Sequence, residues 1–409
     1  MSARFRSSFP LLVLALGAFV LGTSELAVAG LLPWISADLG VTTGTAGGLV
    51  TAYAAAVALL GPPLAAILRG VSRRHRLLAA LGAQLVGNGI TAVATDLPVL
   101  FAARALTGAG AALYAVTAIS LATALVGPDR RGRAVSLVFG SITLATVVGV
   151  PAGTALGELL GWRVVYGTLT VATAVVLGCA PLAVRGSASP APADAPADAP
   201  GRLADLPWSR LRVPFAVNAV VTAGHYAAAT YLVALLTEET GIGPAAVTAL
   251  LVTTGVASAA GTFLGGAAAD RDTRRAVVGA AAGTAGGLAV LSAVMSLPAL
   301  AWPAILVWHA AFSAFSTAAQ VAVSERAPGA DLPAATNISV FNTGIAAGSS
   351  LGGLLLPAAG FPVLTLTAAA LPLAGLLLLA ARSERAGAQG RGLGRIRPVG
   401  RAARPGRGR

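Results

Sequence analysis

The sequence predicts an all-α membrane protein with twelve transmembrane helices in two pseudo-symmetric six-helix bundles. Its 409 residues are 56% hydrophobic and only 11% charged, which is far from the balance of a soluble globular domain. Long apolar runs recur along the chain, and each can cross a bilayer as a helix. The net charge of +13 comes from arginines that gather at alternate ends of these runs.

The first apolar run, 10–32, follows two arginines and ends before Pro33. It resembles a secretory signal, but its length and the many runs behind it favour a retained first span. The remaining runs divide into five before a polar break and six after it. Their expected positions are 46–68, 77–95, 98–126, 134–157, 162–184, 213–236, 244–268, 276–297, 299–323, 333–357 and 361–381.

The polar break covers residues 185–212, which are rich in Pro, Ala and Asp and favour an extended cytoplasmic linker. We therefore expect an N-terminal bundle over 1–184 and a C-terminal bundle over 213–381. Residues 382–409 are rich in Arg and Gly and predict a disordered cytoplasmic tail. The tail resembles an RNA-binding segment, but its place beside the last span favours anionic lipid, so we expect no nucleic-acid partner.

The arginines also predict the orientation of the chain. All but two lie in loops or tails on the side of the N-terminus; the exceptions are Arg104, inside a span, and Arg163, on the opposite side. Because cytoplasmic loops carry the excess of positive charge, we expect a multi-pass protein of the plasma membrane with both termini in the cytoplasm. We expect it to act as a monomer.

The two halves of the chain look like a repeat. Arg104 lies six residues after Pro98 in the fourth span, and His309 lies six residues after Pro303 in the tenth. Spans five and eleven each carry glycines at every fourth position, which allows close helix packing in lipid. These glycines are Gly149, Gly153 and Gly157 in the first half, and Gly344, Gly348 and Gly352 in the second.

Glu25 is the one acid well inside a predicted span. A carboxylate at that depth costs roughly 2.5–3.5 kcal/mol, so it usually faces a polar interior and serves a function. Glu25 lies eight residues before Pro33, and Arg104 lies six residues after Pro98. Both are therefore roughly 9–12 Å from the same ends of their helices. We expect them within reach of each other or of a shared water, although Arg104 bound to backbone carbonyls is the alternative.

Four stretches carry a resemblance to a known family. At these residues the chain resembles the major facilitator superfamily, in its twelve-span drug:proton antiporter branch, near the chloramphenicol-resistance and arabinose-efflux-type permeases. The stretches are Gly22-Thr-Ser-Glu25 to Pro33, Ala103-Arg104 to Gly110, Pro128-Asp129 to Arg133, and Gly149-Val-Pro151-Ala-Gly153 running on to Arg163.

The resemblance implies a transporter that exports a small amphipathic solute in exchange for protons, with Glu25 and Arg104 as the proton-coupling residues. It also implies gating roles for Asp270 and Arg271, because the second copy of the cytoplasmic loop signature keeps its acid. The first copy, 68–76, has no acid. The span-five motif around Gly149, Pro151 and Gly153 is typical of antiporters in this branch.

The expected substrate cavity is lined by aromatic and histidine side chains within the spans: Tyr53, Tyr114, His225, Tyr226 and His309. Ordinary helix packing explains such residues about as well. A sugar or metabolite carrier of the same fold remains an alternative function, and a membrane sensor or structural protein is an alternative of another class. The sequence does not favour a membrane enzyme, since it has no cluster of catalytic residue types. It offers no nucleotide-binding loop and a single cysteine, Cys179, so we expect no cofactor and no metal.

Overall fold

The computed structural model describes residues 3–126, 130–184, 206–327 and 331–393, and each element in these ranges is a helix. Most of the linker expected at 185–212 lies outside the described residues. Its last residues, from Trp208 on, are the first turn of α8. The last helix continues to Leu393 and so includes the first part of the tail that was expected to be disordered from residue 382. Residues 394–409 lie outside the described residues.

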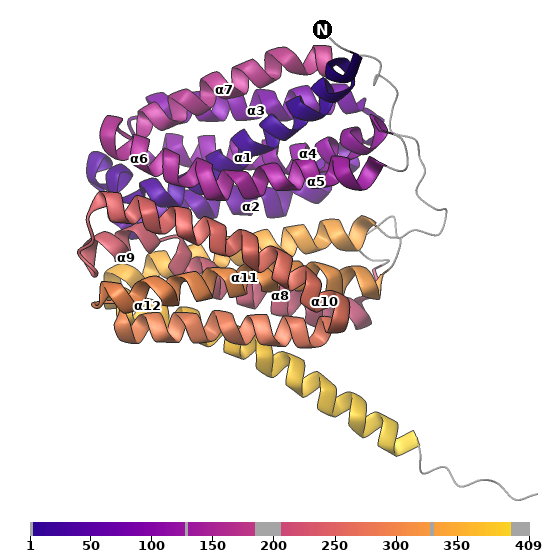
Figure 1. Ribbon diagram of the computed structural model, residues 1–409, viewed down its shortest axis with the longest axis vertical. Helices are drawn as coiled ribbons and strands as arrows, with labels where there is room; N and C mark the ends of the chain where they lie inside the picture. Colours follow the sequence, from indigo (N-terminus) through magenta and orange to yellow (C-terminus); the bar gives the residue numbers. More distant parts are fainter. Residues whose placement is uncertain (1–2, 127–129, 185–205, 328–330, 394–409) are drawn as a thin grey trace, which may run out of the picture.

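The helices before the linker form one group and those after it form a second, stacked against the first (Figure 1). The first group consists of α1 (Ala3–Leu39), α2 (Thr43–Ile67), η1 (Leu68–Gly70), α3 (Arg73–Val93), α4 (Leu97–Ala124), α5 (Arg131–Leu144), η3 (Ala145–Gly149), α6 (Val150–Leu160) and α7 (Trp162–Ala183). The second consists of α8 (Trp208–Ala229), α9 (Leu232–Glu238), α10 (Pro244–Val294), α11 (Pro298–Arg326) and α12 (Asp331–Leu393).

Ten helices in the described ranges are long and apolar enough to cross a membrane. Two of these, in α10 and α12, are about twice the length of a span and contain a break in the backbone. The breaks lie at Asp272, whose φ and ψ are not helical, and at Gly360, whose positive φ of 73° suits a residue without a side chain. Counting each broken helix as two spans confirms the twelve predicted.

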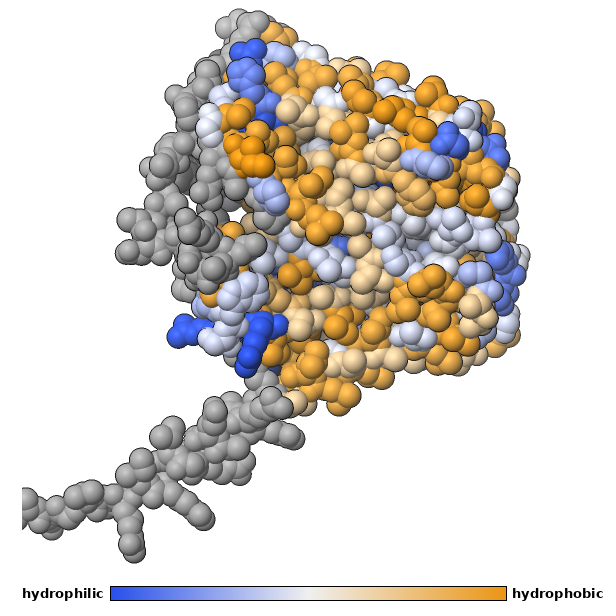
Figure 2. Space-filling view, turned by 180° about the vertical axis from the view of Figure 1, so that it is seen from behind, coloured by the Kyte–Doolittle hydropathy of each residue, from blue (hydrophilic) through white to orange (hydrophobic). Residues whose placement is uncertain are grey.

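The outer surface is that of a membrane protein. Large apolar side chains point outward from many helices, including Leu59 and Leu354, each 72% exposed, and Phe263, 78% exposed. Figure 2 shows apolar residues over the sides of both groups and hydrophilic residues toward the ends of the helices. Such a surface is suited to hydrocarbon and not to water, so the chain is a multi-pass membrane protein.

The glycine-rich spans pack against corresponding helices in the two halves. In the first half, Gly149 approaches Thr23 of α1 and Gly153 approaches Ala27. In the second half, Gly344 lies over Ala219 of α8 and Gly348 over Ala223. Spans one and five thus pair as spans seven and eleven do, which is the duplication that the sequence indicated.

We expect Gly348→Ala to lower the free energy of unfolding by about 1–3 kcal/mol, because overpacking a tight contact strains the backbone. A Cβ atom at Gly348 overlaps the carbonyl group of Ala223, whose carbonyl carbon lies 2.9 Å away and belongs to a helix backbone that cannot move cheaply. Thermal unfolding in detergent measures the loss. Gly279→Ala is the matched control, since nothing lies within 4 Å of its Cβ position. Equal melting temperatures for the two variants contradict this packing.

The two groups share a hydrophobic core at one end only. We call the end that carries the start of α1 the near end and the end that carries Leu39 the far end. At the far end one cluster of buried side chains combines α1, α2, α4 and α7 of the first group with α8, α9, α10, α11 and α12 of the second. At the near end the clusters are separate, one built from α1, α3, α4, α5 and α7 and another from α8, α10 and α11. The structure is therefore closed at its far end.

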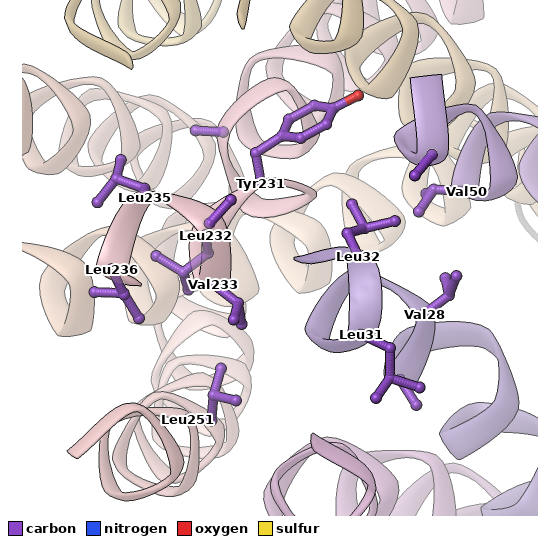
Figure 3. Packing of buried hydrophobic residues seen from close by; sticks show 14 of the residues in the cluster. Val28, Leu31, Leu32, Val50, Tyr231, Leu232, Val233, Leu235, Leu236 and Leu251 are labelled. Atoms are coloured by element: carbon purple, nitrogen blue, oxygen red, sulfur yellow. The ribbon is translucent and has the colours of Figure 1, made fainter. Parts of the chain in front are cut away.

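The short helix α9 forms much of this closure. Figure 3 shows Leu31 and Leu32 of α1 opposite Leu232 and Val233 of α9, and all four are buried. Tyr231, just before α9, fixes the position of this helix. Its hydroxyl donates to the carbonyl oxygen of Ser349 at 2.8 Å and lies 3.5 Å from that of Gly44, so it contacts both halves.

Candidate functional site

Glu25 lies in the middle of α1 and is half-buried. The Tyr53 hydroxyl of α2 donates a hydrogen bond to its Oε2 atom at 3.1 Å. Among the described residues no arginine or histidine lies within ion-pair distance of this carboxylate; the ion pairs there are Arg163–Asp38 and Arg275–Asp272. Glu25 is thus held by a neutral group and is free to change its charge without breaking a salt bridge.

Arg104 lies beside Glu25 but binds backbone. Its α4 helix starts at the far end, where the Asp96 side chain accepts a hydrogen bond from the Val99 amide at 3.0 Å, and this fixes the depth of Arg104. The guanidinium donates to the carbonyl oxygens of Ser24, Glu25 and Leu49 at 2.9, 3.1 and 3.4 Å. The two residues lie at one depth, as expected, but Arg104 contacts the backbone of Glu25 and not its carboxylate.

Tyr53 connects the two charges. While its hydroxyl binds the Glu25 carboxylate, its ring lies under the Arg104 guanidinium, with the guanidinium carbon 4.6 Å from the ring centre. A cation over a tyrosine face is stabilised by about 0.5–2 kcal/mol, more where water is excluded. Tyr53 therefore belongs to the charged centre.

An aromatic cluster faces this centre from the other half. His225 of α8 stacks on Phe312 with ring centres 3.5 Å apart, and the His225 and His309 ring centres are 5.2 Å apart. Tyr226 packs edge-on to Phe312 and Phe341 at 6.0 and 6.2 Å. Tyr226 also lies close enough to Glu25 for an electrostatic interaction. The structure thus joins Glu25 and Tyr53 by a hydrogen bond within the first half, and it places Tyr226 of the second half within electrostatic range of the carboxylate.

Other predicted residues lie elsewhere. Tyr114 is buried and donates to the carbonyl oxygen of Leu14 at 2.6 Å, which joins α4 to α1 toward the near end. Gly149 ends a π-helical turn, η3, and Pro151 follows in the first turn of α6. Such turns mark places where a helix bends. The glycine-proline stretch of span five therefore coincides with an irregular part of the helix.

Asp270 and Arg271 lie at the near end, beside the break in α10. Arg271 donates to the carbonyl oxygen of Ala267, and the ion pair at this break is formed by Asp272 and Arg275 at 3.2 Å. Asp270 is exposed and forms no ion pair with the described residues. A gating role for Asp270 therefore stays a prediction.

We expect Asp270→Asn to reduce transport more than Ala substitution of any single arginine in 69–76, because only the second loop retains an acid. The expected reason is a contact that forms when the near end closes. Transport rates at matched expression measure it. If Asp270→Asn is as mild as the arginine variants, Asp270 has no gating role.

A groove of about 810 Å³ lies apart from the charged centre, between α2, α4 and α12. Its walls are almost wholly apolar, and Leu59, Phe101 and Leu354 are among its lining residues. Glu25 is not part of its lining.

Sequence reasoning missed several buried polar residues of the first bundle. The Ser24 hydroxyl donates to Asn88 Oδ1 at 2.7 Å, and the Gln84 amide donates to the carbonyl oxygen of Thr107 at 3.2 Å. Two amides four residues apart in an apolar span are a signal that a search for charges alone overlooks. The described residues contain no group of three or more potential metal ligands.

Comparison with known proteins adds a family and relatives. The family model "Major Facilitator Superfamily" matches residues 14–328. A chloramphenicol resistance protein of Streptomyces lividans is 36% identical over 64% of this chain and 67% of its own length. The inner membrane transport protein YdhP of Escherichia coli is 32% identical over 86% of this chain and 90% of its own length. A chloramphenicol efflux pump of Mycobacterium tuberculosis is 30% identical over 86% of this chain and 86% of its own length.

Among solved structures, a peptide transporter in complex with alafosfalin is similar in fold. The TM-score is 0.72 over 91% of this chain and 94% of the other, at 16% sequence identity. At that identity the similarity concerns the arrangement of helices alone.

Proposed function

The chain belongs to the Major Facilitator Superfamily and is a transporter of a small-molecule substrate, and from this premise we propose that it exports an amphipathic solute in exchange for protons. The single observation that carries the proton part is the half-buried carboxylate of Glu25, held by Tyr53 and not by a salt bridge. A lone acid at membrane depth is the natural carrier of a proton.

Protonation changes what Glu25 offers to the other half. The ionised carboxylate only accepts hydrogen bonds, whereas the protonated acid also donates one. Tyr53, whose hydroxyl both donates and accepts, is the neighbour that responds directly, and Tyr226 lies within electrostatic range of the changed charge. Because Tyr226 belongs to α8, a proton on Glu25 alters the interaction between the two halves. This is the link between proton binding and the change of conformation.

The solute is expected to bind against the aromatic cluster on α8, α11 and α12. Rings of Tyr226, Phe312 and Phe341 offer faces and edges to a ring-bearing solute. Two relatives are named for chloramphenicol, which makes it the first solute to try. We further propose that the near end faces the cytoplasm, because the arginine-rich loops lie on that side.

A susceptibility panel tests the proposal. Cells that express the protein are expected to tolerate more of at least one amphipathic antimicrobial, beginning with chloramphenicol, than cells that do not. An uncoupler at a sub-inhibitory dose should remove the difference, since it removes the proton gradient. Resistance that persists with the uncoupler, at unchanged expression, contradicts proton-driven export.

A further inference from the structure

The interior of the first bundle contains polar atoms that the protein does not satisfy. Asn88 and Gln84 are each 1% exposed and lie one turn apart on the buried face of α3. Asn88 uses Oδ1 to accept from Ser24, and Gln84 uses its amide nitrogen to donate to Thr107. Within the described residues, Asn88 Nδ2 and Gln84 Oε1 have no partner. One is a donor and the other an acceptor, so a single molecule that both accepts and donates suits the pair.

Arg104 has N–H groups beyond those it uses, and a buried hydroxyl near it lacks a partner. A guanidinium has five N–H donors, and Arg104, 1% exposed, directs three hydrogen bonds to carbonyl oxygens. The hydroxyl of Tyr166 on α7 is fully buried, has no partner in the described part of the chain, and lies close enough to Arg104 for an electrostatic interaction. A buried polar atom left unpaired costs about 1–3 kcal/mol, so a ligand that pairs several of these atoms stabilises the bundle.

We propose that ordered water occupies the interior of the first bundle behind Arg104, bound by Asn88, Gln84, Tyr166 and the remaining N–H groups of Arg104. Water accepts from the Asn88 amide and donates to Gln84 Oε1. Buried waters typically make about three hydrogen bonds to groups that are otherwise unsatisfied, as these are. The site takes water and not a metal ion, because it offers one free amide oxygen and no carboxylate.

The hydration site also positions Glu25, a consequence that rests on the proposed function. Asn88 binds Ser24, the neighbour of Glu25, and Arg104 binds the carbonyl oxygens of both residues. Water that holds Asn88 and Arg104 therefore holds this stretch of α1. The titratable and charged groups around the Glu25 carboxylate are Tyr53 of α2, Arg104 of α4 and Tyr226 of α8.

The melting temperature of Tyr166→Phe shows whether the Tyr166 hydroxyl is bound by water or has no hydrogen-bond partner. If water binds it, the melting temperature of the purified protein falls, because a hydrogen bond is lost. Tyr114→Phe removes a hydroxyl that donates to Leu14, and it calibrates the size of that fall. We expect similar losses for the two variants. An unchanged or higher melting temperature for Tyr166→Phe overturns the proposal, since it shows that an unsatisfied group was removed.

A double-mutant cycle tests the shared molecule. Gln84→Met and Asn88→Leu should each lower the melting temperature, and the double variant should lose less than the sum, because each single variant leaves the other amide unpaired. Gln84→Met combined with Asn218→Leu, a buried asparagine of α8 bonded to Asn337, is the additive control. Additive losses for Gln84 and Asn88 contradict a common ligand. Neither result depends on transport.

The positioning consequence has its own readout. Asn88→Leu is expected to move the pH at which transport is half-maximal, whereas Asn218→Leu changes the rate and leaves that pH unchanged. If Asn88→Leu lowers only the rate, Asn88 stabilises the bundle without positioning Glu25. If even the unmodified protein shows no pH-dependent transport while the melting temperatures behave as expected, the proposed function fails and the water site stands.

Discussion

The substitution Glu25→Gln is expected to abolish proton-driven export while the protein still folds and partly retains solute binding. Glutamine keeps the size of the side chain and can still accept a hydrogen bond from Tyr53, whose hydroxyl lies 3.1 Å from the carboxylate. It cannot take up or release a proton. Export in cells should fall to the level of cells without the protein, and binding of the solute by the purified variant should remain measurable.

Glu158→Gln is the matched control, since it makes the same chemical change at the far end of α6, outside the charged centre. Its export should equal that of the unmodified protein. Undiminished, pH-dependent export by Glu25→Gln excludes Glu25 as the proton carrier. Equal loss in the two variants shows an effect of charge in general.

Arg104→Lys is expected to destabilise the first bundle and to stop transport, although it conserves charge. The guanidinium spans carbonyl oxygens of α1 and α2, at 2.9, 3.1 and 3.4 Å, in directions that its planar fork can reach together. An ammonium group on a flexible stem cannot bind all three oxygens, and each hydrogen bond to a charged group that is lost costs about 1.5–3 kcal/mol. Thermal unfolding and export measure the two losses.

Arg275→Lys provides the comparison, because Arg275 is exposed and its ion pair with Asp272 is at the surface. Surface ion pairs contribute about 0–1 kcal/mol, so little change is expected. A melting temperature for Arg104→Lys equal to that of Arg275→Lys shows that the three backbone contacts do not stabilise the bundle.

The charged residues within apolar runs, the regularly spaced glycines and the lengths of the runs made several features of this structure predictable. Glu25 and Arg104 are conspicuous because a charge within an apolar run is costly, and the spacing of Pro33 and Pro98 gave their common depth. The glycines of spans five and eleven indicated close helix contacts, which Gly153 and Gly348 make. The number of spans followed from the length of the runs, even where α10 and α12 each join two.

The partners of these residues were not predictable in the same way. Every residue has a backbone carbonyl, so no pattern announces that Arg104 binds those of Ser24 and Leu49. Tyr53 is one of several aromatic residues in apolar spans, and only the folded arrangement of α1, α2 and α4 brings it to Glu25. The composition of residues 382–393 does not predict that α12 continues to Leu393, because Gly387, Gly390 and Gly392 disfavour a helix there.

Proton release on solute binding tests the central claim most directly. Purified protein in weakly buffered detergent solution, with a pH indicator, is mixed with the solute that the susceptibility panel identifies. The unmodified protein should release protons as the solute binds, and Glu25→Gln should bind the solute without releasing any. Proton release by Glu25→Gln equal to that of the unmodified protein contradicts the assignment of Glu25 as the group that couples protons to export.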